Sequence, residues 1–214
     1  MDTRSGLRLN LGCGGNAPEG WVNLDRSPGI LVAKVPMLRS VLKAMGLLRG
    51  PQAEAVWPAN ARRWDVTKGL PYEAGSVDAI YSQYMLEHLP RKAAEDLIRE
   101  CARVLRQSGL LRISVPDLRL WAEAYVASPD DEAADEFMRS AELGREQAPT
   151  GLARLVAAVS GAHHQWAYDA RSLSALLRRS GFVPVRVCEY QQGEFPDLER
   201  VERNKGGIFL EAAR

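Results

Sequence analysis

The chain has 214 residues, of which 46% are hydrophobic and 26% charged, and its formal net charge at pH 7 is +1. This length and composition suit one globular domain over residues 1–214, and a charge so close to zero gives no sign of a nucleic-acid partner. The three cysteines are widely spaced and predict neither a disulfide framework nor a zinc site. The N-terminus does not resemble a signal peptide, and no run of 18 apolar residues could span a membrane, so we expect a cytoplasmic protein.

The first strands are marked by apolar alternation. Leucines alternate with polar residues over 7–11, and the glycine turn 12–15 ends that run, so we expect a strand there and a second strand at 21–25. Residues 28–60 form a long connection that contains a helix. Two further strands are expected at 63–66 and 76–82.

The clearest helix follows Pro90, where apolar residues recur at helical spacing, and Gly109 is expected to end it. A fifth strand covers 110–115. Residues 117–168 are expected to be a mostly helical insertion after that strand. Asp169 is a good N-cap for a helix through Ser180, and two last strands are expected at 182–187 and 207–212.

Strands that alternate with helices predict an α/β fold, namely a Rossmann-like, doubly wound and mainly parallel sheet of seven strands with helices on both faces. Ligands of such sheets bind beyond the carboxyl ends of the strands. The candidate functional residues at predicted strand ends are Gly12, Asp25, Asp65, Ser82 and Asp117.

The glycine turn and two acids suggest a nucleotide-like ligand. Gly12 and Gly14 allow the backbone to turn sharply and approach a ligand closely. Asp25 lies 13 positions after Gly12 and can accept two hydrogen bonds from a ribose diol, while Asp65 can accept one from an adenine amino group. A tight turn without a ligand is the alternative for the glycines alone.

Four segments, in this order, resemble the motifs of class I S-adenosylmethionine-dependent methyltransferases, in particular the small bacterial members of the type 11 group. They are the glycine turn Leu11–Gly14, the segment Leu70–Asp78 before the fourth strand, the tetrad Leu86–Leu89 after it, and Glu100–Gly109, in which Gln107-Ser108 replaces the usual Pro-Gly.

The resemblance implies S-adenosylmethionine as cofactor and implies roles for seven residues: Gly12, Cys13 and Gly14 beside its methionine part, Asp25 at the ribose, Asp65 and Val66 at the adenine, and Ser82 near the reacting methyl group. One departure concerns the cofactor's carboxylate. The family has a full helix between the glycine turn and the second strand, whereas here only residues 16–20 separate them, so a helix N-terminus is missing at that place.

A methyl transfer to a hydroxyl must also remove a proton, and histidine suits that task. The candidates are His88, His163 and His164, and we favour His164 because the inserted region should form the acceptor pocket. For each of them, a histidine that only satisfies backbone hydrogen bonds remains the alternative.

Asp117, Trp166 and Tyr168 are candidates for contacts with the acceptor. Asp117 is more readily an N-cap of the following helix, and the two aromatic residues are more often part of a core. Glu87 and His88 could touch a divalent ion, as in some quinone-precursor methyltransferases that the chain resembles. Because no further carboxylate accompanies them, we expect no metal.

We expect the acceptor to be a small molecule, with a hydroxyl of a sugar or secondary metabolite favoured; the oligomeric state stays open. One alternative is a nicotinamide-dependent oxidoreductase, because residues 12–17 fit G-x-G-x-x-G/A. That motif must open a helix, which Pro18 and Gly20 disfavour, and Asp25 follows too soon. A non-catalytic module that binds S-adenosylmethionine is the other alternative.

Residues 30–48 carry an apolar stripe at helical spacing together with basic residues and no acidic ones. A helix that covers one face of the sheet is the favoured interpretation. A lid over the cofactor and a contact with a membrane surface are the alternatives.

Overall fold

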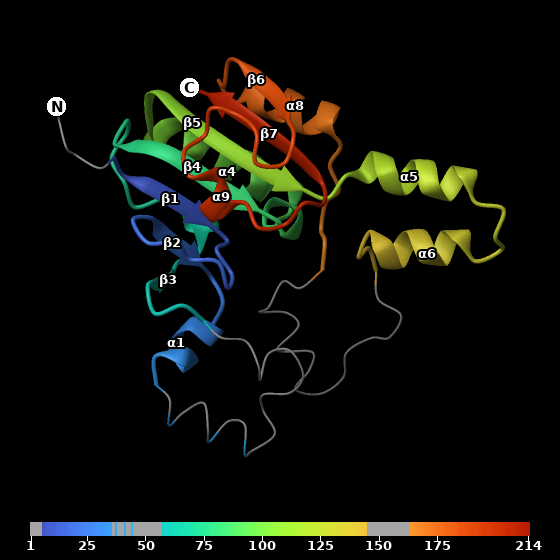
Figure 1. Ribbon diagram of the computed structural model, residues 1–214, viewed down its shortest axis with the longest axis horizontal. Helices are drawn as coiled ribbons and strands as arrows, with labels where there is room; N and C mark the ends of the chain where they lie inside the picture. The colour runs from blue at the N-terminus through green and yellow to red at the C-terminus, as the bar shows by residue number, and fades with distance from the viewer. Residues whose placement is uncertain (1–5, 36, 38–40, 42–43, 45–56, 145–162) are drawn as a thin grey trace.

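The computed structural model describes residues 6–35, 37, 41, 44, 57–144 and 163–214 (Figure 1). These residues form one seven-stranded sheet in the order β3-β2-β1-β4-β5-β7-β6, in which only β7 runs antiparallel to its neighbours. The predicted Rossmann-like, mainly parallel sheet is confirmed. Its strands are β1 Arg8–Leu11, β2 Val22–Asp25, β3 Ala61–Arg63, β4 Val77–Gln83, β5 Leu105–Val115, β6 Val185–Cys188 and β7 Ile208–Ala213.

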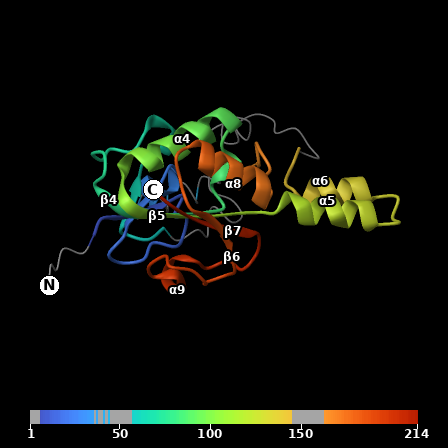
Figure 2. The same cartoon turned by 90° about the horizontal axis from the view of Figure 1, so that it is seen from above.

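Two helices cover one face of the sheet, α4 Arg91–Val104 and α8 Ala170–Arg179 (Figure 2). The apolar stripe of α4 is buried in the main core, as its periodicity predicts. Asp169 begins α8 with a capping box, since its side chain accepts a hydrogen bond from the Ser172 amide and the Ser172 hydroxyl accepts one from the Asp169 amide. The N-cap predicted for this helix is therefore confirmed.

The expected end of α4 is wrong. The helix ends at Val104 rather than at Gly109, because β5 already begins at Leu105. The pairing of β5 with β4 shifts between Leu105 and Leu110, and Ser108 has a φ of 64° in this bulge. A Cβ on Gly109 would lie 2.9 Å from the Arg106 carbonyl oxygen, so the glycine serves the bulge and not a helix C-cap.

The third strand was predicted over 63–66 and lies at 61–63 instead. Asp65 follows it as the N-cap of the short 3-10 helix η1 Val66–Lys68, and this capping takes residues 65–68 out of the strand. A second 3-10 helix, η2 Leu86–His88, follows β4. Both short helices start at the carboxyl edge of the sheet, the edge at which ligands of such sheets bind.

The opposite face of the sheet is covered by the connection between β6 and β7, residues 189–207, together with its one helical turn α9 Leu198–Val201 (Figure 2). This connection packs Phe195, Leu198 and Val201 against Trp21 and Tyr81. The link between β1 and β2 is too short to form the usual covering helix, and its Asn16 side chain donates to the Val201 carbonyl oxygen instead (2.7 Å).

A buried ion pair ties this connection to the sheet. The Arg112 guanidinium on β5 contacts Glu202 through Nε (2.9 Å) and lies 3.7 Å from the Glu211 carboxylate on β7. All three side chains are at most 4% exposed. Arg112 also donates to the carbonyl oxygens of Glu189 and Gln192, so the cation is enclosed by hydrogen-bond acceptors.

The described part of region 117–168 contains two antiparallel helices, α5 Leu118–Ala127 and α6 Ala133–Ser140, which project from the carboxyl edge of the sheet (Figure 1). The rest of the predicted insertion, 145–162, lies outside the described residues. So does most of segment 30–48, of which the structure describes α1 Gly29–Ala33 and a few residues beyond it. No helix within the described ranges is long and apolar enough to cross a membrane.

Candidate active site

The glycine turn lies at the carboxyl end of β1. The amides of Gly12 and Cys13 both donate to the Leu24 carbonyl oxygen, at 2.8 and 3.1 Å, which ties the turn to β2. Gly12 has a φ of 68°, and a Cβ there would lie 2.6 Å from Met85 Cβ and closer still to its Cγ. A Cβ on Gly14 or Gly15 would meet no atom of the described residues within 4 Å, which leaves room for a ligand on this side of the turn.

Replacement of Gly12 by alanine is therefore expected to lower the free energy of unfolding by about 1–3 kcal/mol, because the residue combines a left-handed backbone with a clash against Met85. Gly15→Ala is the matched control: it adds the same methyl group into open space at a residue without a positive φ. Urea unfolding of both variants measures the difference. Equal loss in the two variants would contradict this role of Gly12.

Asp25, at the end of β2, holds two turns together. Its Oδ2 accepts from the Gly14 amide at 3.0 Å and its Oδ1 from the Ser27 amide at 2.8 Å. Cys13 lies beneath it in a small apolar cluster, where burial, together with the nearby Asp25 carboxylate, raises the pKa of the thiol to about 12. Cys13 is thus a neutral packing residue at physiological pH, and no thiolate is available there.

The other residues expected at the cofactor lie along the same edge. Asp65 accepts from the Thr67 hydroxyl and amide, and the hydroxyl bond above all lowers the pKa of that carboxyl. Val66 is buried in the main core. Ser82 pairs with Leu11 in the register of β4 and β1, is 4% exposed, and its hydroxyl has no hydrogen-bond partner among the described residues.

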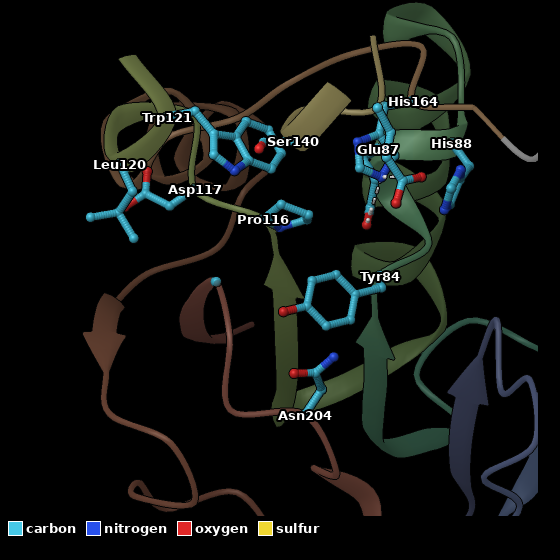
Figure 3. A pocket seen from close by; sticks show the side chains of 12 residues that line it. Tyr84, Glu87, His88, Pro116, Asp117, Leu120, Trp121, Ser140, His164 and Asn204 are labelled. Atoms are coloured by element: carbon cyan, nitrogen blue, oxygen red, sulfur yellow. Dashed lines mark ion pairs between the residues drawn. The ribbon is translucent and has the colours of Figure 1, made fainter. Parts of the chain in front are cut away.

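A pocket of about 410 Å³ lies at the carboxyl ends of β4 and β5 (Figure 3). Residues of α5, α6, η2, the segment before α8 and the connection between β6 and β7 form its walls. The residues that line it are Tyr84, Glu87, His88, Pro116, Asp117, Leu120, Trp121, Ser140, Glu142, His164, Asn204 and Gly207.

Two of the three candidate histidines meet at this pocket. His164 Nδ1 lies 2.7 Å from the Ala141 carbonyl oxygen and His88 Nδ1 lies 3.3 Å from the His163 carbonyl oxygen. A carbonyl can only accept, so each Nδ1 donates and each neutral ring keeps its lone pair on Nε2. The ring centroids are 4.9 Å apart, and burial lowers the pKa of His88.

Glu87 places a buried carboxyl group at the wall of the pocket. It is 1% exposed, and neither carboxylate oxygen has a hydrogen-bond partner in the part of the chain that the structure describes. His164 Nε2 lies 4.0 Å from Glu87 Oε1 and 3.7 Å from Glu142 Oε2. Burial raises the pKa of Glu87 to about 8, and the Glu142 carboxylate adds to that rise.

Of the other residues predicted to contact the acceptor or its proton, only Asp117 lines the pocket. Asp117 lines the pocket and also caps α5, because its Oδ1 accepts from the Arg119 amide. His163 contributes its carbonyl to His88, and its side chain is not part of the pocket lining. Trp166 lies under the Arg91 guanidinium outside the lining, and Tyr168 is fully buried in the main core.

Sequence reasoning missed several lining residues, above all Tyr84, Trp121, Glu142 and Asn204. Tyr84 is two residues beyond the predicted end of the fourth strand and could have been found from that position. Glu142 and Asn204 reach the pocket only because the α5–α6 pair and the β6–β7 connection fold back toward it, and no local pattern indicates this.

The glycine turn does not have the context of a dinucleotide-binding motif. Residues 16–21 follow it as turns and bends without a helix, whereas a G-x-G-x-x-G/A turn must open one. The nicotinamide alternative therefore lacks its structural requirement at this place.

Comparisons with known proteins point to methyltransferases. A family model described as a methyltransferase domain matches residues 9–113. Two probable S-adenosylmethionine-dependent methyltransferases of Mycobacterium tuberculosis are each 29% identical over 143 residues, which is 67% of this chain and 39% of theirs. The aligned part of the chain thus spans about two fifths of the length of these curated relatives.

Two solved structures share the fold. An S-adenosylmethionine-dependent methyltransferase from Archaeoglobus fulgidus is 12% identical, with a TM-score of 0.51, over 98% of this chain and 86% of the other. One from Methanosarcina mazei is 16% identical, with a TM-score of 0.50, over 97% of this chain and 91% of the other. At such low identity these two structures support the architecture and not a particular reaction.

Proposed function

We propose that this chain, which is similar to S-adenosylmethionine-dependent methyltransferases in sequence and fold, is a class I enzyme of that kind, and that it transfers a methyl group to a hydroxyl oxygen of a small molecule. The observation that carries the proposal is the pocket at the carboxyl ends of β4 and β5, the same edge of the sheet at which the glycine turn follows β1, with the Nε2 lone pair of His164 at one side of the pocket. Cofactor residues and acceptor residues would then share one edge of the sheet, as the reaction requires.

The residues at the ends of β1 and β2 fit an adenosyl group. Gly14 and Gly15 leave open space beside the turn. Each Asp25 oxygen accepts one backbone amide and retains a second lone pair, which can accept a ribose hydroxyl. On this basis we assign the cofactor to Gly12, Cys13, Gly14 and Asp25. The family resemblance extends the proposed site to Asp65, Val66 and Ser82.

When bound, S-adenosylmethionine supplies an electrophilic methyl group: a carbon–oxygen bond forms as the sulfonium–carbon bond breaks, S-adenosylhomocysteine leaves, and the acceptor proton goes to His164. The Nδ1 donation to Ala141 fixes the tautomer that leaves Nε2 free to take this proton. His88 is the second candidate for that role, with the same tautomer.

The acceptor side of the pocket favours a small polar molecule. Its volume of about 410 Å³ falls within the range of small-molecule sites, about 300–1,000 Å³. Trp121 offers an aromatic face, and Tyr84, Asp117 and Asn204 offer hydrogen-bonding groups. Such a mixture suits a hydroxylated ring, so we propose a sugar or a hydroxylated secondary metabolite as the acceptor.

The proposed function is tested in two steps. Calorimetric titration with S-adenosylmethionine, S-adenosylhomocysteine, NAD and NADP should give micromolar binding of the two sulfur compounds alone. Incubation with methyl-labelled cofactor and a panel of sugars and phenols should then yield an O-methylated product, located by NMR. Binding without transfer to any acceptor would favour the non-catalytic module, and methylation at nitrogen alone would exclude the hydroxyl acceptor.

Asp25→Ala is expected to weaken S-adenosylmethionine binding at least about tenfold, or about 1.4 kcal/mol, because a charged hydrogen-bond acceptor at the ribose is lost. Calorimetry measures this change. Asp25→Asn is the conservative variant, since its side-chain oxygen can still accept one of the two backbone amides. The unfolding temperature of the ligand-free variants controls for damage to the turn, and an unchanged affinity would remove Asp25 from the site.

A further inference from the structure

We propose that Glu87, His88 and His164 form a binding site for one divalent transition-metal cation. Each residue offers one ligand atom, and these atoms all lie within 4.8 Å of one another. Glu87 and His88 come from η2 after β4, and His164 comes from the segment before α8, so the fold supplies a third ligand that the sequence does not bring near the other two (Figure 3).

The two histidines have the orientation expected of metal ligands. A ligating imidazole donates its other ring N–H to a carbonyl or carboxylate, which fixes the ring and makes the free nitrogen more basic. His164 does so with the Ala141 carbonyl oxygen and His88 with the His163 carbonyl oxygen. Both Nε2 atoms are therefore prepared to donate a lone pair within the same cluster.

Glu87 supplies the independent observation. The residue is 1% exposed, and both carboxylate oxygens are without a hydrogen-bond donor among the described residues. A buried carboxylate without any donor is unfavourable, and such groups in native structures are usually compensated by a partner or an ion. A cation between Glu87 and the two histidines would be that partner. Glu142, 3.7 Å from His164 Nε2, adds negative charge on the exposed side.

The ligand set indicates the kind of cation. Two imidazole nitrogens and one carboxylate oxygen suit Zn²⁺ or Co²⁺, whereas Mg²⁺ and Ca²⁺ prefer oxygen ligands throughout. Bonds of about 2.0–2.1 Å in a tetrahedral site hold two ligand atoms about 3.4 Å apart. His164 Nε2 and Glu87 Oε1 are 4.0 Å apart, so a small rotation of the side chains closes the site.

Three protein ligands leave a fourth position open, and here the pocket adjoins it. If the proposed function holds, the acceptor hydroxyl occupies that position, the cation lowers the pKa of the hydroxyl, and its proton is released to water. Because Nε2 has a single lone pair, the proton transfer proposed for His164 applies to the chain without a cation, and in the cation-bound chain His164 acts as a ligand. The binding of the cation does not depend on this role.

The test is a titration of the chelator-treated protein with ZnCl₂ by calorimetry, and with CoCl₂ followed by visible absorption. We expect one cation per chain and the strong absorption of tetrahedral Co²⁺. Glu87→Gln and His164→Ala should each weaken binding by more than about 100-fold, since loss of a mere hydrogen-bond partner of a ligand already costs about 10–100-fold. His163→Ala, a neighbouring histidine outside the cluster, should bind as the wild type does.

Circular dichroism and binding of S-adenosylhomocysteine confirm that each variant is folded. No binding at about millimolar metal, or an affinity that Glu87→Gln and His164→Ala leave unchanged, would overturn the site. The titration contains neither methyl donor nor acceptor, so its failure is separate from failure of the proposed methyl transfer.

Discussion

Replacement of His164 by alanine is expected to lower the turnover number at least about 100-fold while the affinity for S-adenosylmethionine stays within about twofold. The pocket loses the Nε2 lone pair that would take the acceptor proton or hold the cation. The glycine turn and Asp25 are not among the described residues that line this pocket, so the cofactor site should stay intact. Single-turnover transfer of a labelled methyl group measures the first quantity, and calorimetry with the cofactor measures the second.

His164→Asn is the sharper variant, because the asparagine amide can still donate to the Ala141 carbonyl oxygen while nothing replaces Nε2. It should therefore fold as the wild type does and remain as inactive as the alanine variant. Full turnover in His164→Asn would move the catalytic role to His88 or to no residue. Cation binding by the same variants distinguishes a proton-accepting role of His164 from a ligand role. Only the ligand role predicts that both variants fail to bind the cation.

Local patterns were sufficient wherever one segment alone determines its conformation. The capping box at Asp169 fixes the start of α8, and the apolar periodicity after Pro90 fixes the buried face of α4. The glycine turn and Asp25 lie at neighbouring strand ends because parallel strands bring their carboxyl ends to one edge. These features could be predicted because each follows from a short stretch of sequence or from the general geometry of parallel strands.

The errors arose where pairing between segments decides the structure. Gly109 was expected to end a helix because glycine favours helix C-caps, but the pairing of β5 with Val77 and Ala79 requires a bulge there. Asp65 is expected at the end of a strand over 63–66, but its side chain caps η1 two residues beyond the observed strand. In both cases the expected conformation is common for that residue type, but a different hydrogen-bond arrangement determines the structure at that place.

The pocket could be predicted only in part. Glu87 and His88 are adjacent in the sequence, yet their isolated pair gave no reason to expect a cluster, because His164 is 76 positions further along the chain than His88. The buried carboxylate of Glu87 is a property of the fold: it depends on Gln165 and Trp166, whose amides both donate to the Glu87 carbonyl oxygen and hold that segment across η2. Burial of this kind cannot be deduced from residue types.

Glu202→Ala is expected to lower the free energy of unfolding by about 3–5 kcal/mol, because it leaves the fully buried Arg112 guanidinium without its principal counter-charge. Urea unfolding measures the loss. The control is Asp96→Ala, which breaks exposed pairs with Lys92 and Arg99 on α4 and should leave the unfolding midpoint nearly unchanged. A combined Arg112→Met, Glu202→Leu and Glu211→Gln variant should be far closer to the wild type, since it removes all three buried charges together.

The effect of Glu202→Ala should extend to the pocket. Gln83, at the end of β4, accepts from the amides of Arg203 and Asn204, and Asn204 lines the pocket two residues beyond the ion pair. The face that lacks a helix between β1 and β2 is thus covered by the same connection that forms one wall of the pocket. A stability loss no greater than that of Asp96→Ala would mean that the remaining contacts of this connection, above all those of Phe195, Leu198 and Val201, hold it without the ion pair.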